Sequence, residues 1–322
     1  MKLDYIDKVI RGFCSQIYYD SADSYKASMF LSGSGRSGTT WLAELLVSSG
    51  EIRYMFEPLH PAKHLKYLKA SDLGFIGRNG EPNALAISYI DDVLRGNCRG
   101  LWMDKYNRAH FPKTRLIKEV RANLFLSWIA SQYPGLKLVH MIRNPFLVAA
   151  SQLKGYQRYG SWSPSLSDIK KDDWIAQRLP TDLSDSLAES ESYSFYGKIF
   201  IRWLVENYIV LADLSKHDGK VAVYENLRKN SAEILPLIYN YLGLDWNNDK
   251  LNTIEVPSAM SRENETFAKG DGYISAIKQK LSTSEQKKLD ALLVSAGFGF
   301  YLGSVDSLRI NFSEFGDNLM FR

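Results

Sequence analysis

Short apolar runs alternate with amphipathic stretches along the chain, a pattern typical of α/β proteins with a parallel sheet. One run, residues 136–143 ("LKLVHMIR"), is nearly continuous in apolar residues, as in a strand covered by helices on both faces. Strands are predicted at 28–33 ("SMFLSG"), 115–120 ("RLIKEV"), 136–143 and within 219–227 ("GKVAVYENL").

Helices are predicted after these strands. The stretch "TTWLAELLVSSG" places Trp41, Leu42, Leu45 and Leu46 on one face, and Gly50 is its expected stop. Further helices are expected in "PFLVAASQL", in 231–244 closing on Gly243, and in 284–298. The pattern therefore favours a P-loop-type α/β fold, a central parallel sheet flanked by helices.

Residues 155–194 interrupt this regularity. The segment is rich in Ser, Asp, Tyr and Trp and has weak periodicity, so we expect a long irregular insertion loop. No linker divides the chain, which favours a single domain over residues 1–322.

Composition narrows the class of protein. The chain has 322 residues, is 45% hydrophobic and has a net charge of +4, too mild a charge to indicate a nucleic-acid partner. Its two cysteines, Cys14 and Cys98, are expected to be structural thiols, and no cysteine or histidine spacing suggests a metal site. Neither a secretory signal nor a run of about 18 apolar residues is visible. We expect a cytoplasmic protein without a transmembrane segment.

The turn after the first strand, "GSGRSGTTW", is built for an anion. The first N–H groups of a helix have no internal partner, and the helix dipole adds positive charge at that end. Glycines allow a close approach, Arg36 adds a full charge, and Thr39 and Thr40 add hydroxyl donors. An ATP- or GTP-binding loop requires lysine where Thr39 stands, so this is a phosphate loop without the usual Mg-nucleotide residues.

"GRSGTTWL" resembles the 5′-phosphosulfate loop of sulfotransferases that use PAPS (3′-phosphoadenosine 5′-phosphosulfate). Arginine at position 36 is similar to the carbohydrate and tyrosyl-protein branches. The resemblance implies PAPS as donor, PAP as product and no metal. It also implies that the 5′-phosphate and the sulfuryl group are bound by Gly35, Arg36, Ser37, Gly38, Thr39, Thr40 and Trp41.

"VHMIRNPFLVAASQL" resembles the 3′-phosphate motif of the same family, with Arg143 and Ser151 at the family's spacing of eight residues. Asn144 stands where the family has Asp. Because Arg143 ends a strand and Ser151 lies about two turns into a helix, both can reach one phosphate at the sheet edge. Two further segments resemble the family: "YENL", which implies Tyr224 near the adenine, and a loop with Lys269 and Gly270 over the 3′-phosphate.

Sulfuryl transfer to a hydroxyl benefits from a general base and from cations near the leaving oxygen. Glu57 in "FEPLH" is the expected base, since "FEPL" resembles a motif of the carbohydrate branch; His60 is its rival. Arg36 is the expected transition-state stabiliser. Lys118 and Arg121 add charge to the site or are solvated, and Glu119 is a minor alternative base.

The predicted function is transfer of a sulfuryl group from PAPS to a hydroxyl of a carbohydrate, lipid or small-metabolite acceptor. A P-loop nucleotide kinase or NTPase and an inactive PAP-binding regulatory protein are the alternatives. The aromatic residues of the insertion either contact the acceptor or pack on the body; they are Tyr156, Tyr159, Trp162 and Trp174. Acceptor identity and oligomeric state stay open.

Overall fold

A computed structural model describes residues 14–60, 84–159, 166–254, 271–304 and 308–321. Its strands are β1 (Ser28–Gly33), β2 (Ile52–Phe56), β3 (Thr114–Glu119), β4 (Lys137–Ile142) and β5 (Lys220–Val223). Its longer helices are α2 (Thr39–Leu46), α4 (Ala84–Arg95), α5 (Leu126–Gln132), α6 (Pro145–Tyr159), α9 (Thr181–Ala188), α10 (Phe195–Leu214), α12 (Ser231–Leu242), α13 (Asp271–Lys278) and α14 (Thr283–Ser295). Short helices are α7 (Leu166–Lys170), α8 (Asp173–Ala176) and α11 (Tyr224–Lys229), and 3-10 turns include η2 (Asn123–Phe125) and η3 (Ser190–Ser192).

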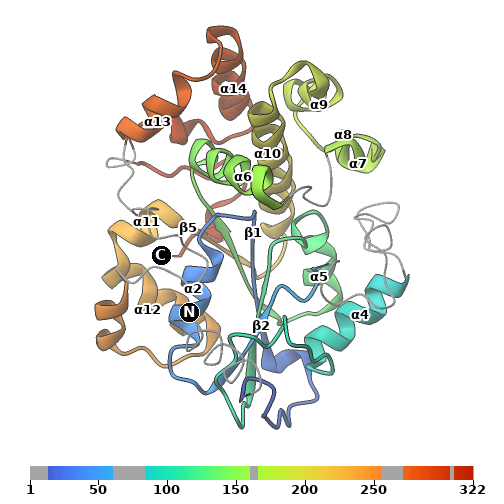
Figure 1. The fold of residues 1–322 in the computed structure, drawn as a ribbon, viewed down its shortest axis with the longest axis vertical. Coiled ribbons are helices and arrows are strands. Elements are labelled where there is room, and N and C mark those ends of the chain that lie inside the picture. Colours follow the sequence, from blue (N-terminus) through green and yellow to red (C-terminus); the bar gives the residue numbers. More distant parts are fainter. Residues whose placement is uncertain (1–13, 61–83, 160–165, 255–270, 305–307, 322) are drawn as a thin grey trace.

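The strands form one parallel sheet in the order β2-β3-β1-β4-β5. Side chains alternate between its two faces. Phe30 packs in the larger core with α4, α5, α6 and α10, whereas its neighbours Met29 and Leu31 pack in the smaller core with α2 and α12. Figure 1 shows α2, α11 and α12 beside one face and α4 and α5 beside the other. The predicted α/β fold with a central parallel sheet is confirmed.

The predicted elements agree closely with the observed ones. The first strand has the predicted bounds, and α12 ends at Leu242 with Gly243 in the left-handed conformation, at a φ of 71°. The helix expected to stop at Gly50 instead ends at Leu46. No helix in the described ranges is long and apolar enough to cross a bilayer.

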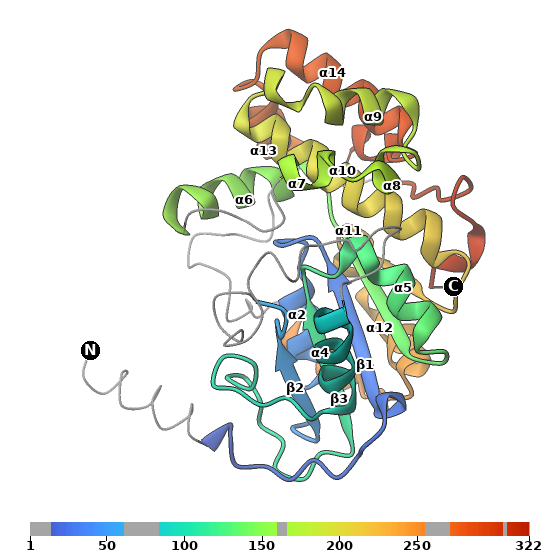
Figure 2. The same ribbon diagram turned by 90° about the vertical axis from the view of Figure 1, so that its right-hand side faces the viewer.

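The irregular insertion predicted at 155–194 is wrong for the part that the structure describes. That part is helical, with the end of α6 followed by α7, α8, α9 and η3. Asp172 caps α8 by accepting from the backbone N–H groups of Trp174 and Ile175. These helices bury few residues each, among them Ile169, Ile175 and Leu183, so their apolar periodicity is weak. Figure 2 shows them at one end of the molecule together with α13 and α14.

Strand β2 was not predicted, because a charged residue interrupts its apolar run. Arg53 is completely buried and lies beside Arg115 of β3 in the sheet register. Asp20 accepts from both guanidinium groups, at 3.1 and 3.0 Å, and Asp104 accepts from Arg53 Nε at 3.1 Å. Arg53 and Arg115 are thus buried at the amino end of the sheet with carboxylate partners for both guanidinium groups.

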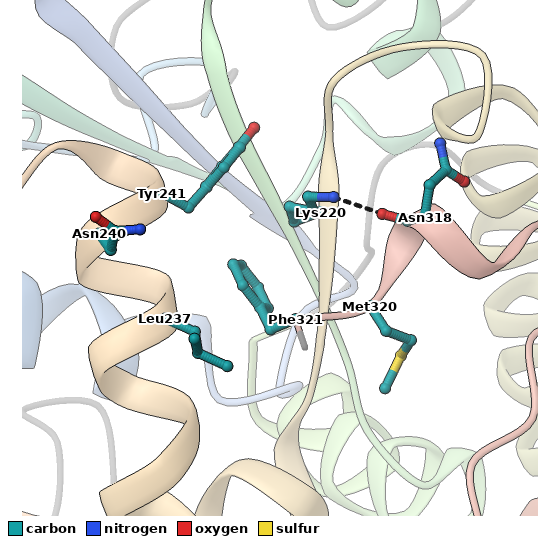
Figure 3. A pocket seen from close by; sticks show the side chains of 7 residues that line it. All are labelled: Lys220, Leu237, Asn240, Tyr241, Asn318, Met320 and Phe321. Carbon is teal, nitrogen blue, oxygen red and sulfur yellow. Dashed lines mark hydrogen bonds between the residues drawn. The ribbon is translucent and has the colours of Figure 1, made fainter.

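The edge strand β5 is covered by the last described residues. Met320 forms an isolated parallel bridge with Val221, and Lys220 Nζ donates to the carbonyl of Asn318 (Figure 3). A pocket opens at this edge. It is lined by Lys220, Leu237, Asn240, Tyr241, Asn318, Met320 and Phe321. Since Lys220 begins β5, this pocket lies at the amino end of the sheet.

A buried chain of hydrogen bonds connects β1, β4 and α10. Ser32 Oγ lies 2.8 Å from His140 Nδ1, and His140 Nε2 lies 2.9 Å from Asn207 Oδ1. The amide oxygen of Asn207 can only accept, so Nε2 carries the proton and Nδ1 accepts from Ser32. Burial lowers the pKa of His140 to about 4, although Asn207 and Glu206 partly offset it. The imidazole is therefore neutral at neutral pH.

Because His140 is buried in its neutral form, we expect the stability of the fold to decrease at acidic pH. The unfolded chain protonates His140 near its ordinary pKa of 6.5 and the folded chain only near 4, so the unfolded state binds more protons between these values. The stabilisation is complete above pH 6.5 and is lost as the pH falls toward 4. We expect the free energy of unfolding to fall by up to ~3 kcal/mol more in the wild type than in His140→Gln. Urea unfolding across this range measures it, and parallel curves for the two proteins would contradict it.

Candidate active site

The carboxyl ends of the parallel strands bring the predicted site residues to one edge of the sheet. Strand β1 lies between β3 and β4, with Ser32 paired to Glu119 and Gly33 paired to Met141. The turn of residues 34–38 therefore leaves the sheet between the segments that carry Lys118 and Arg143. Open parallel sheets bind ligands at this edge.

The turn depends on two residues with positive φ. Arg36 has a φ of 75° and Gly38 a φ of 93°. A Cβ at Gly38 would lie 2.5 Å from a ring carbon of Tyr224, so only glycine fits there. The N–H of Ser37 donates to the carbonyl of Ser34, and no side chain caps the start of α2 at Gly38. The first N–H groups of α2 thus face the turn.

Direct hydrogen bonds connect the turn to the predicted 3′-phosphate motif. Arg36 Nε donates to Ser151 Oγ at 2.9 Å. Arg143 Nη1 donates to the carbonyl of Arg36 at 3.3 Å, and Gln152 Nε2 donates to the carbonyl of Gly35 at 2.7 Å. We call the turn of residues 34–38 and the site of Arg143 and Ser151 the two anion cradles. The two cradles are thus neighbours, and the side chain of Arg36 connects them.

Tyr224 and Trp41 form the wall beside these cradles. The guanidinium of Arg143 lies 4.4 Å from the centre of the Tyr224 ring, and Trp41 packs edge-on against the same ring at 5.8 Å. Trp41 is buried and its Nε1 donates to the carbonyl of Ile254. The side chain of Trp41 therefore supports Tyr224, and its backbone N–H lies in the first turn of α2.

Two buried hydrogen-bond donors in the cradles indicate whether the site suits an anionic ligand. Ser37 Oγ and Arg143 Nε have no hydrogen-bond partner within the described ranges. Buried donors are rarely left unsatisfied in folded proteins. Phosphate oxygens would accept from both, so these residues fit a phosphate-bearing ligand.

Asn144 fills the position of the family's aspartate as a helix cap. Its Oδ1 accepts from the N–H groups of Phe146 and Leu147 at the start of α6. Its own N–H donates to Glu225 Oε1 at 2.8 Å. Burial raises the pKa of Glu225, while the nearby Arg143 and this hydrogen bond partly offset the effect.

Glu57 is held between two cations at the end of β2. Lys118 Nζ lies 2.6 Å from Oε1 and Arg121 Nη1 lies 3.0 Å from Oε2. Burial alone would raise the pKa of Glu57, but these two cations outweigh burial and lower it to about 2. The residue has a φ of 44°, which turns the chain sharply after the strand. Lys118 is buried, so its interpretation as a solvated residue is wrong.

Glu119 has a structural role. Its carboxylate is completely buried and accepts from the backbone N–H groups of Leu59, Val120 and Arg121. These bonds hold the segments after β2 and β3 together. The minor alternative of Glu119 as base is not supported, because no part of its carboxylate is exposed.

His60 lies one turn after Glu57. Its N–H donates to the carbonyl of Glu57, and its ring packs edge-on against Trp102 at 5.0 Å. The side chain of Trp174 packs on the larger core, with Arg178 over its ring at 4.5 Å. Lys269, Gly270 and Trp162 lie outside the described residues, as do the side chains of Tyr156 and Tyr159.

A model of the sulfotransferase family matches residues 28–195, which is just over half of the chain. The chain therefore belongs to the sulfotransferase family. This confirms the family and the enzyme class predicted from its motifs. The match contains both cradles and Glu57, whereas Tyr224 lies beyond it.

Solved structures that match the chain include other sulfotransferases. The mouse sulfotransferase SULT7A1 complexed with PAP is 18% identical, with 86% of each chain covered and a TM-score of 0.46. A sulfotransferase from Alicyclobacillus acidocaldarius is 15% identical, covering 83% of this chain and 95% of its own, with a TM-score of 0.39. A retinol dehydratase in complex with retinol and PAP is 14% identical, covering 87% and 83%, with a TM-score of 0.45. No curated protein matches the chain.

The bond between Arg36 and Ser151 predicts coupling between the two cradles. Arg36→Lys keeps the charge but removes the Nε donor, and Ser151→Ala removes the acceptor. We expect each change to weaken binding of PAP, with the double variant losing ~1 kcal/mol less than the sum of the two. Isothermal titration of the four proteins with PAP measures the coupling.

Ser48→Ala serves as the matched control in a second cycle with Arg36→Lys. Ser48 Oγ bonds to the carbonyl of Leu45 and to the side chain of Tyr239 beyond the end of α2, so this cycle is expected to be additive. Additivity in the Arg36–Ser151 cycle as well would show that the bond has no influence on nucleotide binding.

Proposed function

We propose that the protein transfers a sulfuryl group from PAPS to a hydroxyl of a carbohydrate, lipid or other small-metabolite acceptor. The observation that carries the proposal is the connection of the two anion cradles through Arg36. Its Nε donates to Ser151 Oγ, and its backbone carbonyl accepts from Arg143 Nη1. A single adenosine bisphosphate can place one phosphate in each cradle and its adenine beside Tyr224. An Mg-nucleotide loop would require a lysine where Thr39 stands.

Each cradle has its own task in this proposal. The side chains of Arg143 and Ser151 bind the 3′-phosphate. The turn of residues 35–38 and the first N–H groups of α2 bind the 5′-phosphate and the sulfuryl group. When bound, PAPS supplies the sulfuryl group and leaves as PAP. One oxygen bridges phosphorus and sulfur in PAPS. Arg36 stabilises the negative charge that develops on this oxygen as its bond to sulfur breaks.

Glu57 accepts the proton of the acceptor hydroxyl in this mechanism. A carboxylate with a pKa of about 2 is a weak base toward a free alcohol. The alcohol proton becomes strongly acidic only as its oxygen bonds to sulfur, so a weak base suffices if the proton is transferred late. Lys118 and Arg121 hold the carboxylate in place from both sides. Lys118 lies on β3, between Glu57 and the turn, and completes the cationic surface toward the sulfuryl group.

Nucleotide selectivity tests the proposed donor site. PAP at a hundred times its dissociation constant should stabilise the protein by about 2.7 kcal/mol. ATP with magnesium at the same concentration should produce little change, because the loop has no lysine for a triphosphate. Thermal unfolding with each nucleotide measures this difference. Stabilisation by ATP with magnesium and not by PAP would instead identify a kinase or NTPase.

Substitution of the base tests the mechanism. Glu57→Gln should lower turnover by ~100-fold or more while PAP affinity stays near normal. His60→Asn is the matched control and should retain most of the turnover. Sulfated product from a panel of hydroxyl acceptors, detected by mass spectrometry, provides the measurement. PAP binding without sulfation of any acceptor by the wild type would favour the regulatory alternative.

The pH profile separates the two bases independently. Since the pKa of Glu57 is about 2, the carboxylate stays ionised and kcat/KM should not fall from about pH 8 to about pH 5 on its account. A histidine base would lose activity below about pH 6.5. A tenfold decrease per pH unit in that range would therefore exclude Glu57.

A further inference from the structure

Glu206 and Asn207, neighbouring residues of α10, form hydrogen bonds with Ser34, the first residue of the turn. Ser34 Oγ donates to Glu206 Oε2 at 2.6 Å and accepts from Asn207 Nδ2 at 3.1 Å. All three side chains are buried. The amide of Asn207 is oriented by a second bond, from Nδ2 to the carbonyl of Trp203 at 2.7 Å. The direction of each hydrogen bond is thus determined by its partners.

Glu206 is itself fixed on every side. Its Oε1 accepts from Arg202 Nε at 2.7 Å and its Oε2 accepts from Asn123 Nδ2 at 3.0 Å as well as from Ser34. Asn207 continues into the His140 and Ser32 chain described above. The hydroxyl of Ser34 therefore lies between two rigid partners on the longest helix of the described chain.

Ser34 in turn sets the backbone of the phosphate loop. Its carbonyl accepts the N–H of Ser37, which closes the turn just before α2. Arg143 and Gln152 hold the carbonyls of Arg36 and Gly35 further along the turn, and no side chain caps α2 at Gly38. The bonds to Ser34 Oγ anchor the turn where it leaves β1.

We propose that Glu206 and Asn207 are positioning residues for the 5′-phosphosulfate loop and act through the hydroxyl of Ser34. They orient the loop N–H groups toward the 5′-phosphate and do not contact the nucleotide. The inference rests on the proposed function of the loop. Both residues lie beyond the segment that the family model matches, so the family match does not assign them.

Comparison of two nucleotides tests this role. PAP uses both cradles, whereas adenosine 3′-monophosphate lacks the 5′-phosphate and uses only the cradle of Arg143 and Ser151. In Ser34→Ala the dissociation constant of PAP should rise about tenfold, and that of adenosine 3′-monophosphate should change less than about twofold. Ser34→Thr, which keeps the hydroxyl, should restore most of the affinity for PAP.

Ser32→Ala is the matched control. Ser32 lies in β1, two residues before Ser34, is equally buried and bonds to His140 in the same chain of hydrogen bonds. Loss of the Ser32 hydroxyl should leave the ratio of the two dissociation constants unchanged, because this hydroxyl bonds to His140 of β4. If Ser34→Ala unfolds too easily for titration, Ser34→Cys, with similar volume and a weak donor, provides the same comparison.

Three results would overturn the inference and leave the proposed function standing. Equal weakening of both nucleotides by Ser34→Ala would indicate a general structural role, and unchanged PAP affinity would show that the loop needs no support from α10. An equal change of the ratio in Ser32→Ala would place the effect elsewhere in the chain of hydrogen bonds. A wild-type protein that binds neither nucleotide would instead overturn the proposed function, and the inference with it.

Discussion

The position of β1 between β3 and β4 is the constraint on which the whole site depends. Parallel strands end at a common edge, so β1 supplies the phosphate loop where β3 supplies Lys118 and β4 supplies Arg143. The register matters as much as the order. Leu31 pairs with Lys118, and a slip of one residue would turn Lys118 to the opposite face of the sheet. The ion pair with Glu57 would then be lost.

The charge arrangement around Glu57 suits the anionic donor that we propose for the loop. A donor with several negative charges would raise the pKa of a nearby carboxylate and weaken its ionisation. Burial acts in the same direction. Lys118 and Arg121 oppose both effects, so the carboxylate stays ionised beside an anionic nucleotide. The same cations reduce its strength as a base, which is why the proposed mechanism places the proton transfer to Glu57 late.

The sequence allowed the central fold to be predicted where its periodicity was simple. Strand β1 and the helix that closes on Gly243 follow from apolar runs and glycine stops. Strand β2 could not be predicted, because its buried Arg53 is matched by Asp20 and Asp104, which are distant in sequence. The helices of the insertion were missed because each buries only one or two apolar residues.

The candidate site shows the same division. Arg36, Arg143 and Ser151 stand in short motifs that resemble those of a family, so single positions could be named before their contacts were known. The bond from Ser34 to Glu206 joins residues that are 172 positions apart. A serine in a glycine-rich turn and a glutamate on a helix have no local pattern that relates them, and only the packing of α10 beneath the turn brings them together.

The replacement of the family's aspartate by Asn144 fits an anion site for an electrostatic reason. Asn144 still caps α6 through Oδ1, which is the task that an acidic oxygen would perform. A carboxylate at this position would lie beside Glu225, which is already buried and has a raised pKa. Two buried anions next to Arg143 would compete with a phosphate for its charge. The neutral amide keeps the helix cap and adds no second anion beside Glu225, so the departure from the motif is compatible with the 3′-phosphate site that we propose.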